Sequence, residues 1–168
     1  ISFVGLIRRY KGLETLIKSM KFIENKNIKL IIAGEFYEPL EKYLKIIKNL
    51  GLDNKIIIRN EFLDSKMIRD FICASDLIIQ PYIKASQSGI TPLCYFYETP
   101  SVVSNIDGLK EIIIKDKSGT TFEKTPKDLS TSILESLDKQ KNNNYIINIK
   151  RSKKKYTWLS FVEELQKL

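Results

Sequence analysis

The sequence contains no histidine and only two cysteines among its 168 residues. Without histidine, this chain alone cannot build Ser-His or Cys-His nucleophilic catalysis or a His-ligated zinc site. Cys73 and Cys94 stand inside apolar helical patterns and lack the spacing of a metal knuckle or a redox pair. We therefore interpret both as buried small hydrophobic residues in a reducing compartment. Any general base must be a carboxylate or come from elsewhere.

Long apolar runs are also missing. Charged or amide residues interrupt every Ile/Leu-rich run well before the roughly 18 to 20 apolar residues that a membrane-spanning helix needs. The chain begins at Ile1 without a basic-then-apolar leader, which favours a piece of a longer protein over a secreted one. We expect a soluble, cytoplasmic chain with one compact core.

Positive charge exceeds negative charge by a formal +8. This balance favours an anionic partner, which is a nucleotide phosphate, an acidic membrane surface or a nucleic acid. Lys42, Lys45 and Lys48 are typical of a solvated helix face. The denser run at residues 150–155 leaves peripheral contact with the inner face of the membrane open beside a solvated face. Aromatic and basic residues do not alternate along any strand, so we expect no nucleic acid partner.

Short β-branched runs alternate with amphipathic helical stretches along the chain. This alternation predicts an α/β fold with a Rossmann-like, doubly wound parallel sheet flanked by helices. Glycine, proline and capping residues punctuate the pattern where helices are expected to begin and end. Strands are predicted at residues 1–4, 29–33, 55–59, 77–79 and 101–104, a short extended piece at 120–122, and helices around 13–23, 40–50, 67–72, 90–97 and 125–137.

The last part of the chain has a different character. Residues 139–144 are predicted to be a polar linker. After them, Trp158, Phe161, Val162 and Leu165 recur at helical spacing and share one face. We expect residues 1–140 to form the binding domain. Residues 141–168 are expected to be a linker and C-terminal helices that belong to the same domain or pack back on a missing N-terminal domain.

Ligands of open parallel sheets bind at the carboxyl ends of the strands, so the loops there are the candidate sites. The loop at residues 5–12 places Arg8 and Lys11 beside a turn. A guanidinium fork, an ammonium group and unpaired N–H groups together suit a diphosphate, although a merely basic surface loop would have the same composition.

Three more loops follow predicted strands. Gly34 and Glu35 could admit a ribose or a base edge, or form an unexceptional turn. Glu111 is expected to be a structural cap rather than a catalytic acid. The loop after the fourth strand suits a second phosphate cradle, although an ordinary helix cap would look the same. Its candidate residues are Ser86, Gln87, Ser88, Gly89 and Ile90.

Taken in order, these segments resemble the C-terminal, donor-binding domain of family 4, or group 1, GT-B glycosyltransferases. The resemblance covers nearly the whole chain and implies one half of a GT-B fold. The matching motifs are Phe3-Val4-Gly5 to Lys11-Gly12-Leu13, Leu30-Ile31-Ile32-Ala33-Gly34, Ala74-Ser75-Asp76-Leu77 with Pro81, Thr99-Pro100-Ser101-Val102-Val103-Ser104-Asn105, and Gly108-Leu109-Lys110-Glu111 to Gly119.

The resemblance implies a donor site built from Gly5, Gly34, Glu35 and the two cradles. Arg8 and Lys11 would neutralise the donor diphosphate, although the family's arginine place falls on Leu6. The backbone at residues 88–90 would hold the distal phosphate, and main-chain groups near residues 59–62 the base. The family's paired glutamates are replaced by Ala85 and Leu93. The sequence instead resembles a Ser-Gln-Ser-Gly branch, so Ser86, Gln87 and Ser88 are candidates for sugar contact.

The implied activity is transfer of a hexose from a nucleoside diphosphate sugar, with retention and without a metal or other cofactor. The acceptor, a glycan, lipid or protein, would bind the missing N-terminal domain, so this fragment alone is expected to be inactive. The alternative is a non-catalytic nucleotide-binding module or a flavodoxin-like or receiver-like signalling module. A receiver needs an acidic cluster at the strand ends, whereas the strands here end in Gly5, Gly34 and Gln80.

Overall fold

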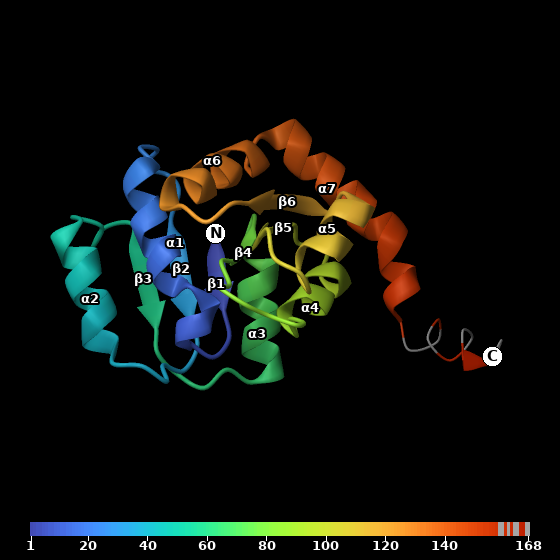
Figure 1. Cartoon of the computed structure of the whole chain (residues 1–168), viewed down its shortest axis with the longest axis horizontal. Helices are drawn as coiled ribbons and strands as arrows, with labels where there is room; N and C mark the ends of the chain where they lie inside the picture. The colour runs from blue at the N-terminus through green and yellow to red at the C-terminus, as the bar shows by residue number, and fades with distance from the viewer. Residues whose placement is uncertain (158–159, 161, 163–164, 167–168) are drawn as a thin grey trace.

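A computed structural model describes residues 1–157, 160, 162 and 165–166 of the chain. Its six strands form one parallel sheet in the order β3-β2-β1-β4-β5-β6 (Figure 1). The order reverses between β1 and β4, and this doubly wound topology confirms the predicted fold class. The strands are β1 Ser2–Val4, β2 Leu30–Ala33, β3 Ile56–Arg59, β4 Ile78–Gln80, β5 Ser101–Ser104 and β6 Gly119–Phe122.

Helices cover both faces of this sheet (Figure 1). On one face α1 packs between α2 and α6, whereas α3 packs beside α4. The helical stretches predicted between residues 13 and 137 are all present as helices. Their bounds are α1 Leu13–Ser19 followed by η2 Met20–Phe22, α2 Leu40–Asn49, α3 Ser65–Cys73, α4 Ile90–Phe96, α5 Lys110–Asp116, α6 Pro126–Ser136, α7 Lys139–Ser152 and η3 Lys153–Tyr156.

The core has two layers because side chains alternate along each strand. Phe3 points into the larger layer, which includes residues of α1, α2 and α6, whereas its neighbour Val4 points into the smaller layer with residues of α3 and α4. A polar cap fixes the start of α3, where Asp64 accepts a hydrogen bond from the Met67 N–H at 2.7 Å. The sheet is therefore held rigidly from both sides, with its carboxyl edge carrying the loops.

Two predictions were wrong. Cys94 is buried, but Cys73 is exposed, because it stands one position past Ile72 and so about 100° away from the apolar stripe of α3. Residues 139–144 are not a linker but the first turns of α7. Asp138 caps this helix by accepting from the Lys141 N–H at 3.0 Å, and the Asn142 amide donates to the carbonyls of Ser136 and Asp76.

The predicted C-terminal apolar face cannot be placed, since Trp158 and Phe161 lie outside the described residues. Among the helices that are described, none is both long and apolar enough to cross a membrane.

Candidate functional site

The loops at the carboxyl ends of β1, β2 and β4 are joined by main-chain hydrogen bonds. The Ile7 N–H donates to the Glu35 carbonyl at 2.9 Å, and the Tyr37 N–H donates to the Ile7 carbonyl at 3.0 Å. On the other side, the Ile83 N–H donates to the Tyr10 carbonyl at 2.7 Å. Segments far apart in sequence thereby form one continuous edge at the point where the strand order reverses.

Two glycines let these loops approach each other closely. Gly12 has φ +68°, and a Cβ there would lie 1.8 Å from the Pro81 carbonyl oxygen. Gly34 has φ +144°, and a Cβ there would lie 2.1 Å from the Gly5 carbonyl oxygen. Any side chain would force the backbones apart, so glycine is required at both positions. These contacts hold the β1 loop against the β4 loop and the β2 loop.

Lys11 is the central cation of this edge. Lys11 ends a short 3₁₀ turn, η1 Arg9–Lys11, and its side chain reaches back toward Gly5. A Cβ added to Gly5 would lie 3.4 Å from the Lys11 Nζ. The same Nζ lies 5.6 Å from the centroid of the Tyr82 ring. Burial, and then the nearby charge of Arg8, hold the pKa of Lys11 below its usual 10.5. No carboxylate pairs with Lys11 among the described residues. A partly desolvated cation of this kind favours an anion.

The β4 loop meets Lys11 through Tyr82, a residue that the sequence analysis did not single out. The Tyr82 hydroxyl lies 3.4 Å from the Ser88 Oγ, which accepts from the Ile90 N–H at 3.2 Å. The Ile90 Cδ1 lies 3.7 Å from where a Cβ added to Gly5 would stand. Burial raises the pKa of Tyr82 to about 12, so it is a neutral phenol. The only sequence signal for Tyr82 is its place directly after Pro81.

The structure therefore brings Gly5, Lys11, Ser88 and Ile90 together. The Ser88 hydroxyl closes a local turn, but it does not cap α4, because the N-cap of that helix is Gly89 and makes no side-chain hydrogen bond. Gly89, Ser86 and Gln87 lie on the exposed part of the same loop. Their contact with a ligand stays a prediction.

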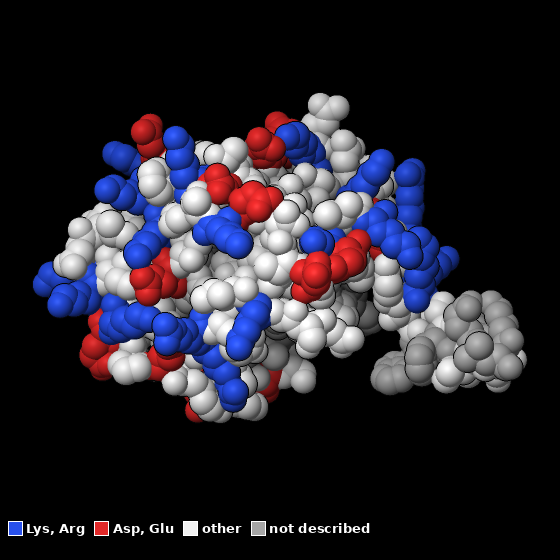
Figure 2. Space-filling model, in the orientation of Figure 1, with Lys and Arg blue, Asp and Glu red and all other residues white. Residues whose placement is uncertain are grey.

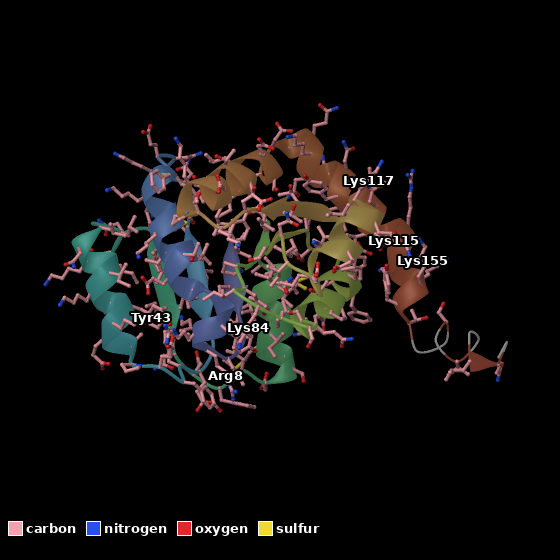
Figure 3. The ribbon with its side chains drawn as sticks, in the orientation of Figure 1. Arg8, Tyr43, Lys84, Lys115, Lys117 and Lys155 are labelled. Atoms are coloured by element: carbon pink, nitrogen blue, oxygen red, sulfur yellow. The ribbon has the colours of Figure 1, made fainter. Side chains whose placement is uncertain are left out.

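Arg8 lies on the other side of Lys11 and is exposed. Its guanidinium stacks over the Tyr37 ring, 4.7 Å from the centroid, and so leans toward the β2 loop. Arg8 and Lys84 are both found at the carboxyl edge of the sheet (Figure 3). No ion pair holds either of them among the described residues. The edge thus presents a cluster of uncompensated cations.

A pocket of about 160 Å³ opens between the β1, β2 and β3 loops, directly beside Gly5. Phe62 forms part of its wall and is 72% exposed. The walls are mainly apolar, so the pocket suits a flat ring next to the charged cradle. It is lined by Gly5, Leu6, Gly34, Glu35, Phe62, Leu63 and Ile68.

A larger hollow of about 480 Å³ lies between α1 and α2 and is a weaker candidate for an anion. Two of its cations, Lys18 and Lys42, already pair with Glu14 at 2.7 and 3.3 Å. Its aromatic residue, Tyr43, donates to the Glu38 carboxylate, and burial together with Glu38 raises the pKa of Tyr43. Glu111, which was expected to be a structural cap, accepts from the Gly108 N–H at 3.0 Å, one residue before the N-cap Leu109 of α5.

Comparison with known proteins identifies the family of this chain. Residues 1–153 match the family described as glycosyl transferases group 1. An uncharacterised glycosyltransferase of Methanocaldococcus jannaschii, MJ1607, is 28% identical over 169 aligned positions, which cover 98% of this chain and 43% of the relative. Protein CapJ of Staphylococcus aureus is 26% identical over 109 positions, covering 64% of this chain and 27% of its own length.

Solved structures share the fold. The C-terminal domain of the group 1 glycosyltransferase LpcC from Francisella tularensis superposes with a TM-score of 0.76 at 20% identity, covering 88% of this chain and 80% of the other. The Anabaena protein Alr3699/HepE, in complex with UDP-glucose, superposes with a TM-score of 0.80 at 17% identity, covering 99% of this chain and 49% of the other.

The chain thus spans less than half the length of the curated relatives that it matches. The family match covers all six strands and the loops that carry the candidate site, which also decides against a signalling module of the receiver type. The chain belongs to the glycosyl transferases group 1 family and has the Rossmann-like α/β fold of the C-terminal domain of GT-B enzymes.

Proposed function

We propose that this chain is the donor-binding half of a hexosyltransferase, which transfers a hexose from a nucleoside diphosphate sugar with retention and without a metal. The observation that carries the proposal is the position of Lys11. Its ammonium group is held against the Gly5 turn, partly desolvated and without a carboxylate partner among the described residues. A nucleoside diphosphate supplies the negative charge that this position lacks.

The reaction places its developing charge on the departing nucleoside diphosphate. Lys11 and Arg8 stand at the same edge and are proposed to stabilise that charge, a role in which fixed cations accelerate group transfer. The backbone around Gly89 is proposed to contact the distal phosphate.

The pocket beside Gly34 is proposed to hold the base and ribose. Its apolar wall at Phe62 suits a flat ring, and Glu35 offers a carboxylate at its rim for ribose hydroxyls. The similar fold of the Anabaena protein in complex with UDP-glucose supports a nucleotide sugar as the ligand. The transferred sugar would then lie toward Ser86 and Gln87, on the exposed part of the β4 loop.

The acceptor, a glycan, lipid or protein, is proposed to bind a second domain outside this chain, since the chain spans 43% of its M. jannaschii relative. We propose a cytoplasmic location, where nucleotide sugars and a reducing environment are both present.

Nucleotide titration tests this function. The chain is titrated with UDP, GDP and a short RNA at two salt concentrations, alongside Lys11→Met and the matched control Lys45→Met, an exposed lysine on α2. We expect a mononucleotide to bind and Lys11→Met to weaken it at least about tenfold, since a charge-assisted contact contributes about 1.5–3 kcal/mol. The control should match the unsubstituted chain.

Equal binding by both variants would remove Lys11 from the site, and binding of RNA alone would contradict the proposed function. Arg8→Ala is judged separately by thermal shift. A ligand-induced shift equal to that of the unsubstituted chain would remove Arg8 from the site.

A further inference from the structure

The excess positive charge of the chain is concentrated in one segment far from the candidate site. Residues 139–157 contain seven of the 28 cationic residues and none of the 20 acidic ones. This segment forms α7 and η3 and runs along the end of the molecule next to α5 and α6 (Figure 1). Without it, the rest of the chain would be almost neutral, so the net charge of the molecule is a property of this surface.

One face of α7 packs on the body of the molecule and the opposite face is exposed. Ile149 and Ser152 are buried, whereas Ile147, Arg151 and Lys154 follow one another at helical spacing on the exposed side. Because the buried stripe is narrow, most of the helix surface is left for contact with something else.

The end of α5 continues this exposed surface. The Asn148 amide donates to the Lys117 carbonyl at 3.0 Å, which holds α7 against α5. Lys115, Lys117 and Lys155 lie at this same end, away from Arg8 and Lys84 (Figure 3). Figure 2 shows basic side chains gathered at this end of the molecule. We call the exposed residues Ile114, Lys115, Lys117, Ile147, Lys150, Arg151, Lys154 and Lys155 the basic strip.

Carboxylates of the body compensate only part of the strip. Glu98 pairs with Lys150 of the strip at 3.4 Å. It also pairs at 2.6 Å with Lys153, a half-buried residue that does not belong to the strip. Asp116 lies 3.8 Å from Lys155. Among the residues that the structure describes, no ion pair is found for Lys115, Lys117, Arg151 or Lys154. Clustered like charges repel one another, so an anionic partner would relieve that repulsion.

The strip also carries exposed apolar side chains, which indicate the kind of anion. Ile114 is 57% exposed and Ile147 is 45% exposed, both among the cations. Beside η3, Phe96 is 68% exposed and lines a hollow of about 340 Å³ together with Lys153 and Lys154. Aliphatic side chains between lysines suit a lipid interface, where they enter the headgroup region while the ammonium groups stay at its surface. Phosphate backbones of nucleic acids offer no such apolar layer.

We infer that the basic strip docks the protein on a membrane surface that contains anionic lipid. The contact is peripheral: cations of α7 and α5 meet the headgroups, and Ile114 and Ile147 enter the interface. Because the strip lies at the end of the molecule opposite α2, docking leaves the candidate donor site open to solvent (Figure 1).

Vesicle flotation tests this inference with the chain and two triple variants of equal net charge. Lys117→Gln/Arg151→Gln/Lys154→Gln removes charge from the strip, whereas Lys26→Gln/Lys45→Gln/Lys48→Gln removes it from exposed lysines of α2 and the turn before β2. Each basic residue next to an anionic membrane strengthens binding about fivefold. The strip variant should therefore bind vesicles of phosphatidylcholine with phosphatidylglycerol about a hundredfold more weakly, and the control about as well as the unsubstituted chain.

Vesicles of phosphatidylcholine alone should bind none of the three proteins, and salt should weaken binding to the anionic vesicles. Ile147→Ser, which leaves the charge unchanged, should lower that binding about tenfold. Unfolding midpoints measure whether each variant is folded. If the first strip variant does not fold, Lys115→Gln/Lys117→Gln/Arg151→Gln takes its place. Equal loss in both triple variants would overturn the inference. So would strip-dependent binding of a short RNA without binding to anionic vesicles.

Discussion

At the scale of single residues, the ammonium group of Lys11 decides how the candidate site responds to pH. Burial and Arg8 hold the pKa of Lys11 below 10.5, so this side chain loses its proton at lower pH than an exposed lysine does. A bound diphosphate favours the charged form and raises that pKa again. Above the pKa that Lys11 has in the unliganded protein, nucleotide binding therefore requires Lys11 to take up a proton.

We expect nucleotide affinity to be independent of Lys11 titration near pH 7 and to fall as the pH approaches 10.5, by up to tenfold per pH unit. Isothermal titration between pH 7 and 10.5 measures this. Lys11→Arg is the control, because a guanidinium stays charged over this range and any titration of the ligand itself affects both proteins equally. Parallel profiles for the two proteins would show that Lys11 does not carry the phosphate charge.

The same residues show what the sequence could and could not predict about the site. Lys11 and Ser88 were found because they stand in loops after predicted strands, and the sheet topology brings those loops together. Tyr82 and Phe62 were not predicted as site-forming side chains, because their roles depend on distances to Lys11 and Gly34 that no local pattern encodes. The exposure of Cys73 likewise depends on its position one residue past Ile72, which turns its side chain about 100° away from the buried side of α3.

At the scale of secondary-structure elements, the junction between α5 and the C-terminal segment depends on one buried carboxylate. The Asp116 side chain is 2% exposed and accepts hydrogen bonds from the Tyr156 hydroxyl at 2.6 Å and from the Tyr95 hydroxyl at 3.1 Å. The two tyrosine rings pack edge to face, 5.2 Å apart. Burial and Asp116 raise the pKa of Tyr156, so it remains a neutral donor.

Asp116→Asn is expected to lower the free energy of unfolding by about 1–2 kcal/mol, because charge-assisted hydrogen bonds become neutral ones. Tyr156→Phe should cost about 1 kcal/mol, and the double variant less than the sum, since both changes remove the same contact. Urea unfolding measures all three. Asp53→Asn, at an exposed carboxylate, should stay within about 0.5 kcal/mol of the unsubstituted chain. Strict additivity would show that the two residues act independently.

Elements with an apolar stripe were predictable, whereas α7 was not. Short β-branched runs located the strands, and hydrophobic periodicity located α1 to α4 because each of these helices buries one face against the sheet. The start of α7 is a run of lysine and asparagine with no stripe at all. It is helical because Asp138 caps it and Asn142 bonds to the carbonyls of Ser136 and Asp76, and the last of these lies 66 residues away in sequence. Such a contact exists only once the chain has folded.

At the scale of the whole molecule, the candidate donor site is an open edge rather than an enclosed cleft. The Lys11 cradle, Arg8 and the pocket at Phe62 all lie along the carboxyl ends of the strands, with solvent above them. Group transfer needs an acceptor held in line with the donor and water kept away from the reacting centre. Nothing in the described part of this chain stands opposite the edge to do either.

We therefore expect the chain to bind a nucleotide and to transfer no sugar. The measurement is release of nucleoside diphosphate from a panel of nucleotide sugars, with and without candidate acceptors. The full-length relative from M. jannaschii, of which the chain matches 43%, serves as the positive comparison. Binding without turnover would agree with a divided site, in which this half neutralises the diphosphate and another domain positions the acceptor. Sugar transfer by residues 1–168 alone, abolished by Lys11→Met, would instead mean that one open edge suffices for catalysis.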